Sequence, residues 1–338
     1  MTTVRPHAHA VMAADSFAAL FDDARLARFA ELAAVGAPTH IADVDDPAHA
    51  ASLAETEVLV TSWGAPVFDE ALLTRMPKLR AVFHAAGSVR HHVTDALWDR
   101  GILVTSAADA NAVPVAEFTL AAIILAGKRA FTHIRTDVDD DRRWNGLEAG
   151  TTIGNVDRTI GIVGFSRIGR RVVDLLRQLD GLRVLVADPF ADAAAVAASG
   201  ATLVPLADML PAVDVLSLHA PALPATRQMI GAAQLAALPD GATVINTARG
   251  GLLDHGALLD HCRAGRLDAV LDVTDPEPLP AASELRHLPN VTITPHLAGS
   301  LGTELRRLTD SALDELAAYT QGRAPRHPVT RADMETTA

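Results

Sequence analysis

The chain has 338 residues, of which 49% are hydrophobic and 21% are charged, and its formal net charge is −12. This length exceeds what one ordinary hydrophobic core holds, so we expect two domains. The negative charge argues against a nucleic acid or an acidic membrane surface as partner, because both attract concentrated positive charge. The single cysteine, Cys262, excludes an intrachain disulfide and a thiolate metal site.

The start of the chain, from Met1 to Pro6, lacks the charged and then apolar pattern of a signal peptide. The longest apolar run, Leu120 to Ala126, is much shorter than the roughly 20 residues that a membrane-spanning helix needs. We therefore expect a soluble, cytoplasmic protein without a membrane partner.

Apolar strands and helical segments alternate over about the first 100 residues. Thr56–Thr61 and Leu79–Phe83 predict strands, and Pro66–Arg75 predicts a helix between them, with the proline in its first turn. A long helix is expected over Val113–Ala130. This alternation is typical of a parallel sheet with crossover helices.

A polar stretch, Asp137–Gly154, separates this part from the next. Its four clustered aspartates repel one another, which favours a solvated loop, and Trp144 within it suggests a contact with another subunit. Beyond it, six strands are expected at Thr159–Val163, Arg183–Ala187, Val213–Leu218, Ala242–Asn246, Ala269–Val273 and Val291–Thr294.

Helices fill the gaps between these strands, including Arg167–Gln178 and Gly256–Ala264, and a last helix is expected at about Leu301–Thr320. Six such strands make a complete doubly wound nucleotide-binding sheet. From Gly322 onward we expect a frayed end.

The first strand of this second part is followed by a glycine-containing turn. Dinucleotide-binding turns carry the pattern G-x-G-x-x-G, in which small residues let the backbone approach a pyrophosphate at a helix N-terminus. Here Ser166 takes the middle glycine's place; its side chain narrows the approach, but its hydroxyl can bond a phosphate oxygen. A two-glycine match alone also fits a plain tight turn. The expected cofactor contacts in this turn are Gly164, Ser166, Arg167, Ile168 and Gly169.

The next strand ends at Asp188, about two dozen residues after Gly164. An acid at this point accepts hydrogen bonds from ribose hydroxyls and repels the extra phosphate of NADP. The residues that follow, Pro189–Asp192, include no arginine to neutralise such a phosphate. The sequence therefore favours NAD over NADP, while an aspartate that only caps the following helix is the alternative.

Three later segments each follow a predicted strand, on the edge of the sheet where ligands bind in open α/β folds. They are Asn246–Gly251, Asp272–Pro278 and Thr294–Ser300. Taken singly, an arginine before two glycines suits a surface turn, and one histidine among 14 is more often structural. The order of the three segments along the chain supports a functional role for them.

Taken in order, these segments resemble the D-isomer-specific 2-hydroxyacid dehydrogenase family. The resemblance runs from about Thr56 to Ser300 and includes Asn111–Glu117 and His219–Thr226. It implies an α/β protein with two doubly wound parallel sheets. A Rossmann NAD-binding domain is expected at residues 111–302, and a flavodoxin-like, discontinuous catalytic domain at 1–110 and 303–338. Family members are commonly dimers joined through the nucleotide domain, so a homodimer is expected.

The resemblance also implies hydride transfer between NAD(H) and a D-2-hydroxy acid or its 2-oxo acid. By this match His296 is the general acid and base, and Glu277 hydrogen-bonds its other nitrogen. Arg249 binds the substrate carboxylate through its planar fork. Asp272 matches the position that holds the nicotinamide carboxamide. The remaining residues matched to the cofactor site are His219, Ala220, Pro221, Thr226, Thr247 and Ala248.

Residues 84–90 fall where the family has a glycine-containing loop whose backbone N–H groups bind the carboxylate, so Gly87 and Ser88 are expected substrate contacts. The loop lacks the family's usual glycines and acidic residue and continues as Arg90-His91-His92. Three interpretations stay open. Adjacent histidines point apart, which disfavours a metal site; plain surface polarity is the second; contact with a second acidic group on the substrate is the third. No other metal site is expected.

Two other functions remain as alternatives. The family includes formate and phosphite dehydrogenases. Glu277 stands where formate dehydrogenases carry glutamine, which argues against a formate dehydrogenase. Of these two enzymes, a phosphite dehydrogenase-like one stays open. The fold also occurs in NAD-sensing corepressors that act without catalysis, which the charge of −12 disfavours. The sequence does not name the acid, the direction of reaction in the cell or the pathway.

Overall fold

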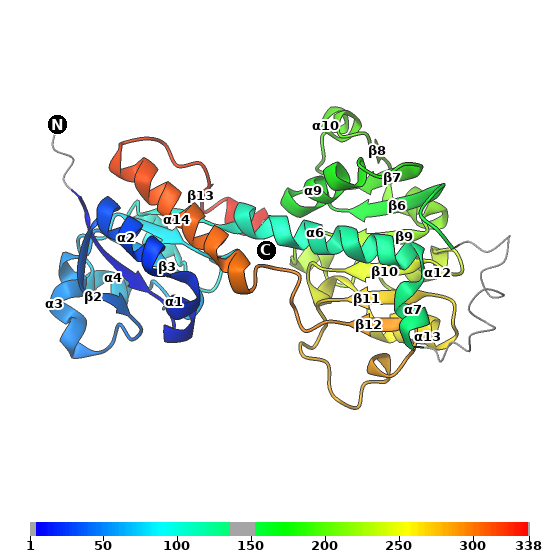
Figure 1. Ribbon diagram of the computed structural model, residues 1–338, viewed down its shortest axis with the longest axis horizontal. Coiled ribbons are helices and arrows are strands. Elements are labelled where there is room, and N and C mark those ends of the chain that lie inside the picture. The colour runs from blue at the N-terminus through cyan, green and yellow to red at the C-terminus, as the bar shows by residue number, and fades with distance from the viewer. Residues whose placement is uncertain (1–4, 136–152, 337–338) are drawn as a thin grey trace. The chain divides into compact units, whose positions relative to one another are not determined.

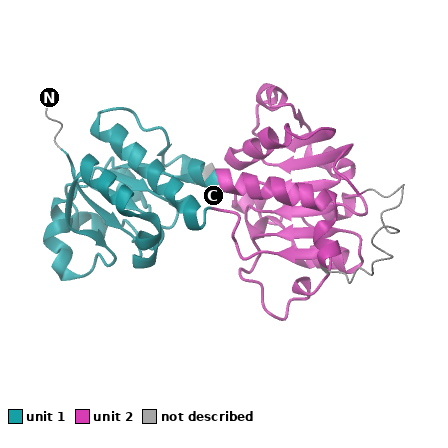
Figure 2. Cartoon of the chain, viewed as in Figure 1, with its two compact units in different colours: residues 1–112, 300–338 teal, residues 113–299 magenta. Residues whose placement is uncertain are grey.

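The computed structural model describes residues 5–135 and 153–336, so Trp144 and nearly all of the expected loop at Asp137–Gly154 lie outside the described residues. The chain divides into two compact units (Figure 2). Unit 1 comprises residues 1–112 and 300–338, and unit 2 comprises residues 113–299. Each unit is built on its own sheet, and the strands are parallel except at one edge of unit 1.

Unit 1 holds a six-stranded sheet in the order β13-β5-β4-β3-β1-β2. Without β13 this is the flavodoxin-like order of a doubly wound sheet. Of the central strands, β3 and β4 are buried at every position and β1 at all but its first, as expected when helices cover both faces. The strands are β1 (His7–Val11), β2 (Ala34–Ile41), β3 (Val58–Thr61), β4 (Ala81–His84), β5 (Leu103–Ser106) and β13 (Pro328–Val329).

Helices cover the two faces of the unit 1 sheet. One core joins the sheet to α1, α2 and α14 through buried side chains such as Leu20, Phe29 and Leu313. The other joins it to α3, α4 and α5 through Leu53 and Leu73, among others. The helices are α1 (Ala14–Leu20), α2 (Asp23–Leu32), α3 (Ala50–Glu55), α4 (Glu70–Arg75), α5 (Asp95–Asp99), α14 (Leu305–Thr320) and α15 (Asp333–Thr336).

Two expectations for unit 1 are wrong. Helix α4 begins at Glu70 rather than Pro66, because the Asp69 side chain accepts a hydrogen bond from the backbone N–H of Leu72 and caps the helix there. Residues 323–336 do not form a frayed end, since β13 pairs antiparallel with β5 and α15 follows it. Tertiary hydrogen bonds order a segment whose composition alone suggests a loose tail.

Unit 2 holds a seven-stranded parallel sheet in the order β12-β11-β10-β9-β6-β7-β8. Counted from β6, its first six strands follow the Rossmann order 3-2-1-4-5-6, which confirms the predicted fold class. Each of the six expected strands is present; β8 has two residues and leaves no pattern in the sequence. The strands are β6 (Arg158–Val163), β7 (Leu182–Ala187), β8 (Thr202–Leu203), β9 (Val215–Leu218), β10 (Thr243–Asn246), β11 (Asp268–Leu271) and β12 (Val291–Ile293).

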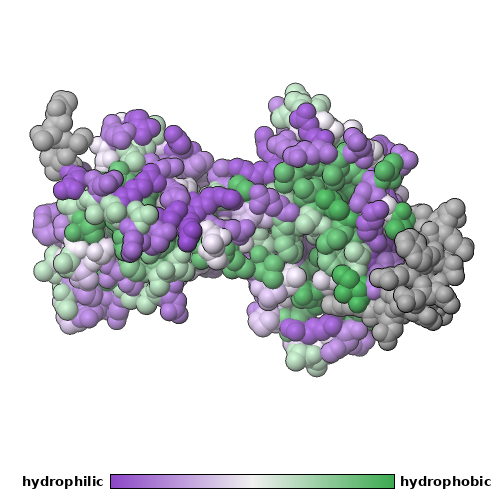
Figure 3. Space-filling view, in the orientation of Figure 1, coloured by the Kyte–Doolittle hydropathy of each residue, from purple (hydrophilic) through white to green (hydrophobic). Residues whose placement is uncertain are grey.

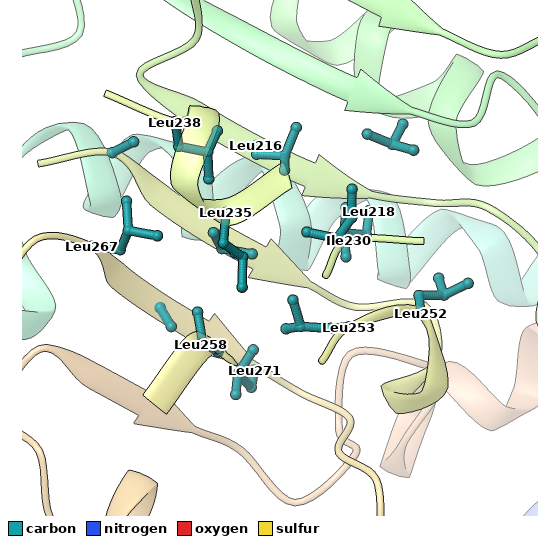
Figure 4. Close-up of a cluster of buried hydrophobic side chains, with 14 of the residues drawn as sticks. Leu216, Leu218, Ile230, Leu235, Leu238, Leu252, Leu253, Leu258, Leu267 and Leu271 are labelled. Atoms are coloured by element: carbon teal, nitrogen blue, oxygen red, sulfur yellow. The ribbon is translucent and has the colours of Figure 1, made fainter. Parts of the chain in front are cut away.

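Two hydrophobic cores hold the helices of unit 2 to its sheet. Leucines from β9 and β11 pack with those of α12 and α13 on one face (Figure 4). On the other face, α6 and α9 pack against β6 and β7 (Figure 1). The helices are α6 (Ala108–Gly127), α7 (Ala130–Arg135), α9 (Arg167–Leu176), α10 (Ala193–Ala198), α11 (Leu206–Met209), α12 (Ala232–Ala237) and α13 (His255–Arg263).

Helix α6 begins five residues earlier than the expected Val113, and the boundary between the units falls within it. Among the described residues it is the one helix long and apolar enough to cross a membrane by length and composition. Half of the most apolar 18-residue stretch of α6 is buried inside the protein. Within the helix, the Thr119 hydroxyl forms a hydrogen bond with the hydroxyl of Thr247, which follows β10. Core helices of soluble proteins pass the same test, so α6 is weak evidence for a membrane span.

Candidate active site

Two glycines let the backbone fold tightly where β6 turns into α9. Gly164 has φ +96°, and a Cβ on it would lie 2.7 Å from the backbone nitrogen of Ala220. A Cβ on Gly169 would lie 2.0 Å from the carbonyl oxygen of Gly164. No other residue fits either position without moving the backbone. The first turn of α9 thus begins directly at the carboxyl end of β6, which suits a bound phosphate.

Ser166, in the place of the middle glycine, precedes α9 with an exposed side chain. Its hydroxyl makes no capping hydrogen bond to the helix, so capping does not compete with a ligand for it. Arg167 is also exposed, whereas Ile168 packs against the core behind the turn. The turn therefore presents a hydroxyl and the start of a helix on one side and apolar packing on the other.

Asp188, at the end of β7, ties this turn to the neighbouring strand. Its Oδ2 accepts a hydrogen bond from the N–H of Phe165 at 2.8 Å, and its Oδ1 accepts one from Phe190 at 2.9 Å. The following helix, α10, is capped by Asp192 instead, so the alternative of a capping Asp188 is wrong. Each oxygen of Asp188 keeps a lone pair for another donor, such as a ribose hydroxyl.

His219, after β9, is buried against the glycine turn. Its Nε2 pairs with the Ser217 hydroxyl at 2.8 Å, while its Nδ1 is buried with no hydrogen-bond partner among the described residues. Burial lowers the pKa of His219 to about 3, so the ring is neutral at pH 7. Beyond Ala220, the Thr226 hydroxyl donates to the carbonyl of Pro221 at 2.6 Å and fixes the turn that follows.

Arg249 follows β10 in a tightly held loop. Asn246 accepts a hydrogen bond from the N–H of Ala248 at 3.0 Å and donates one to the carbonyl of Arg249 at 2.9 Å. A Cβ on Gly250 would lie 2.0 Å from the carbonyl of Thr274, so this loop rests against the one after β11. Asn246 was not expected as a site residue; a polar residue at the end of a buried strand is the signal that marks it.

The Arg249 side chain is exposed, although protein atoms surround much of its guanidinium. Desolvation lowers the pKa of Arg249, and the negative charge of Glu277 opposes that shift. A guanidinium stays charged under either influence. One N–H donates to the carbonyl of Ala248 at 2.7 Å, which leaves other donors of the fork for a ligand.

His296 and Glu277 form a close pair. The imidazole Nδ1 lies 2.5 Å from Glu277 Oε1, and both side chains are about half exposed. Because Nδ1 faces the carboxylate, Nε2 is the nitrogen left to exchange a proton with a ligand. The structure thus brings His296 and Glu277 together, and it places Arg249 within electrostatic reach of Glu277.

Asp272 holds the turn that carries His296. Its carboxylate is buried and accepts hydrogen bonds from the Thr294 hydroxyl at 2.6 Å and from the N–H groups of Leu297 and Ala298 at 2.8 and 2.9 Å. Its carbonyl accepts a hydrogen bond from the N–H of His296, whose φ is +53°. Thr294 is a further residue that the sequence analysis missed.

A pocket of about 550 Å³ opens beside the pair, at the carboxyl ends of β11 and β12. Its size suits a small ligand. It is lined by Asp272, Thr274, Glu277, Pro278, Leu279, Arg286, Ile293, Thr294, Pro295 and His296.

Gly87 and Ser88 belong to unit 1, in the loop that follows β4. The backbone N–H groups of residues 86–89 have no hydrogen-bond partner in the described part of the chain, and Gly87 packs against the Asn111 side chain. The N–H of Ala85 donates to the carbonyl of Thr61 at 2.7 Å. Successive unpaired N–H groups in a braced loop suit an anion such as a carboxylate.

The next residues, Arg90-His91-His92, point in different directions. The guanidinium of Arg90 donates to the carbonyl of Met334, near the end of the chain. The ring of His92 lies 5.3 Å from that of His84, whose pKa burial lowers to about 3, and His91 is exposed. No group of three metal-binding side chains occurs among residues 5–135 and 153–336.

Comparison with known proteins gives this site its context. The Rossmann order of unit 2 and its glycine turn define a dinucleotide-binding domain, and residues 121–298 match the D-isomer specific 2-hydroxyacid dehydrogenase, NAD binding domain. The chain belongs to the D-isomer specific 2-hydroxyacid dehydrogenase family. This confirms the resemblance and the expected cofactor, NAD.

The chain is 31% identical over 251 residues to D-3-phosphoglycerate dehydrogenase of Methanocaldococcus jannaschii, covering 73% of this chain and 46% of that protein. The chain thus spans about half the length of the D-3-phosphoglycerate dehydrogenases that it matches. It is 34% identical over 254 residues to (S)-sulfolactate dehydrogenase of Chromohalobacter salexigens, covering 73% and 80%. The fold is similar to that of D-mandelate dehydrogenase of Rhodotorula graminis, with a TM-score of 0.79, 22% identity and coverage of 97% and 98%.

Burial of His219 makes stability depend on pH. Its pKa is about 3 in the fold and 6.5 ordinarily, so below pH 6.5 the unfolded chain binds a proton that the folded chain does not. Its contribution to stability is therefore greatest above pH 6.5 and falls as the pH drops toward 3. When the pH is lowered from 7 to 5, we expect His219 to reduce the free energy of unfolding by about 2 kcal/mol.

Urea unfolding of native protein and His219→Gln at both pH values measures this. The variant should lose less stability on acidification than native protein, and His287→Gln, at an exposed histidine, should lose as much as native protein. Equal losses of stability in native protein, His219→Gln and His287→Gln would mean that burial of His219 does not cause the pH dependence.

Proposed function

We propose that this protein interconverts a D-2-hydroxy acid and the corresponding 2-oxo acid with NAD(H). The observation that carries the proposal is the pairing of His296 with Glu277 at 2.5 Å, beside Arg249 and on the same sheet as the glycine turn. A proton donor, its carboxylate partner and a carboxylate-binding cation are what reduction of a 2-oxo acid requires besides a hydride.

The residues of unit 2 fit a dinucleotide. Gly164 and Gly169 leave no room for side chains where the pyrophosphate would approach, and Ser166 supplies a hydroxyl that does not cap α9. Asp188 would accept hydrogen bonds from a ribose. The Nδ1 of His219, which has no hydrogen-bond partner in the described part of the chain, is a buried polar atom on the same edge. When bound, NAD(H) supplies or accepts the hydride.

The chain's own groups would do the remaining work. Arg249 binds the carboxylate of the substrate through its planar fork, which also orients the neighbouring carbonyl. His296 gives a proton from Nε2 to the carbonyl oxygen in reduction and takes it from the hydroxyl in oxidation. Glu277 fixes the ring through Nδ1 and stabilises the imidazolium. In unit 1, the N–H groups of Gly87 and Ser88 bind a carboxylate oxygen.

One of the two alternatives fits these observations less well. A corepressor that only binds NAD has no need of a proton-transfer pair, whereas His296 and Glu277 are held by a dedicated turn. The N–H groups of residues 86–89 suit phosphite as well as a carboxylate, so the choice of substrate separates a phosphite dehydrogenase-like enzyme from a 2-oxo acid reductase. The names of the relatives include phosphoglycerate and sulfolactate dehydrogenases, so acids with and without a second anionic group belong in any substrate test.

We predict that native protein consumes NADH with at least one member of a 2-oxo acid panel. His296→Gln should lower kcat about 10²–10⁴-fold because the proton donor is lost, with little change in the KM for NADH. His287→Gln, at an exposed histidine, serves as the matched control and should keep full activity. Full activity in His296→Gln would disprove the assigned proton donor; phosphite oxidation without reduction of any 2-oxo acid would favour the alternative enzyme.

The same assay tests the cofactor preference. Asp188→Ser removes the charge that repels the phosphate of NADP and should shift the ratio of kcat/KM for NADPH over NADH upward by about tenfold. Asp192→Ser, at the neighbouring aspartate that caps α10, should leave the ratio unchanged. An equal shift in both variants would mean that Asp188 does not face the ribose.

We also propose that the protein is a cytoplasmic homodimer joined through unit 2. Figure 3 shows hydrophobic residues gathered on the face of unit 2 over α6. Leu125, Ile134 and Val156 are 40, 79 and 69% exposed, and the N–H of Gly154 donates to the carbonyl of Gly127, so the segments that carry them are neighbours. Clustered exposed apolar residues mark an interaction surface.

Sedimentation should give a mass near twice the 35.5 kDa of one chain. Ile134→Glu should shift the protein to monomers, because a buried unpaired carboxylate is costly at an interface. Phe190→Glu changes a residue that is 95% exposed elsewhere on unit 2 and should leave the dimer intact. A monomeric native protein would rule out the dimer.

A further inference from the structure

The end of the chain, residues 323–336, forms a segment that we call the C-terminal strap. Its start is fixed by Glu315 on α14, a buried carboxylate that accepts hydrogen bonds from the N–H groups of Arg326 and His327 at 3.0–3.1 Å. Next, β13 pairs antiparallel with β5 through Pro328 and Val329. The strap is therefore an integral part of the unit 1 sheet.

The second half of the strap is fixed to α5. The guanidinium of Arg331 lies 2.6 Å from Asp99 and 3.1 Å from Asp95, two carboxylates on that helix. Asp333 then accepts hydrogen bonds from the N–H and the hydroxyl of Thr330 at 2.7 Å, which orders the turn before α15. These contacts set where α15 begins.

From there the strap reaches the loop after β4. Met334 is partly buried and packs against the hydrophobic cluster that contains Val89 and Leu97. Its carbonyl accepts a hydrogen bond from the guanidinium of Arg90. An apolar and a polar contact thus join the strap to the far side of the loop, whose N–H groups at residues 86–89 have no hydrogen-bond partner among the described residues.

The two sides of that loop are held by different parts of unit 1. Its beginning is tied to β3, since the N–H of Ala85 donates to Thr61 and the Ser62 hydroxyl donates to the carbonyl of Ala85. Its far side is held by the strap at Arg90, which donates to the carbonyl of Met334, while the Met334 side chain packs on the cluster to which Val89 belongs. Four N–H groups bind an anion well only when they converge on one point, so both sides must be fixed.

We propose that the C-terminal strap positions the carboxylate-binding loop, and that Arg90 acts through this contact rather than by binding a second charge on the substrate. The proposal rests on the proposed function, because it takes the loop at residues 86–89 as the carboxylate site. It makes Arg90 and Met334 positioning residues that affect every 2-oxo acid alike.

The test compares Arg90→Ala and Met334→Ala with native protein, using hydroxypyruvate and 3-phosphohydroxypyruvate, which differ only in a phosphate. Each variant should raise the KM for both acids by a similar factor, about five- to tenfold, with kcat and the KM for NADH changed less than about twofold. Arg90→Ala removes the hydrogen bond to the carbonyl of Met334, and Met334→Ala removes the apolar packing. The double variant should cost less than the sum of the two single changes, because both contacts hold the same side of one loop. Arg100→Ala, which removes an arginine bonded to Glu70 and Leu73 on the same unit, should leave all three constants unchanged.

A rise confined to 3-phosphohydroxypyruvate would overturn the proposal, since it would mean that Arg90 binds the phosphate. Unchanged KM values would overturn it as well. Hydrogen exchange gives a readout that does not need activity: the amides of His92 and Val93, which donate to the carbonyl of Val89, should exchange faster in both variants but not in Arg100→Ala. If exchange changes while no 2-oxo acid is reduced, the proposed function fails and the strap stands; if exchange is unchanged, the strap fails whatever the activity.

Discussion

A buried carboxylate organises the edge of the unit 2 sheet that carries the candidate active site. Asp272 sits at the end of β11, where the strand's backbone hydrogen bonds stop, and three donors from the segment after β12 converge on it. A buried charge is costly unless it is fully hydrogen-bonded, and here the hydrogen bonds of the turn meet that need. The same bonds hold His296 in a backbone conformation that residues with a side chain seldom adopt.

The position of Asp272 has a consequence for how the remaining site residues are held. Glu277 reaches back to His296 from the segment after β11, and Gly250 packs against the carbonyl of Thr274 in that same segment. Arg249 is therefore linked to the pair through backbone packing as well as through charge. A change at any of these loops transmits to the others, because close-packed backbone has little room to adjust.

The sequence predicts the strands of the sheets and most of the candidate site residues that follow them. Apolar runs such as Val184–Ala187 show where strands lie, and the parallel order follows from the helices between them. Arg249, Glu277 and His296 were identified by their order after successive strands. Asn246 and Thr294 were missed because their roles lie in hydrogen bonds across the turns, which no spacing in the sequence encodes.

Other misses have the same physical origin. The extent of α4 depends on a cap at Asp69, and a proline three residues earlier suggests an equally good start. The C-terminal strap is ordered by Glu315, a contact between segments that composition does not reveal. Arg90 has a polar neighbourhood in the sequence but binds a carbonyl more than 200 residues away. Local pattern predicts elements, whereas long-range hydrogen bonds decide their ends.

Both ends of the chain belong to unit 1, so unit 2 interrupts it as one continuous insert. The segments on either side of the insert are adjacent, since the N–H of Ser300 donates to the Asn111 side chain at 2.9 Å. An insert whose entry and exit lie side by side can be exchanged for another without disturbing its host. This arrangement lets the nucleotide-binding module and the host sheet diverge at different rates, and it makes a graft of unit 2 into a related host a tractable route to hybrid enzymes.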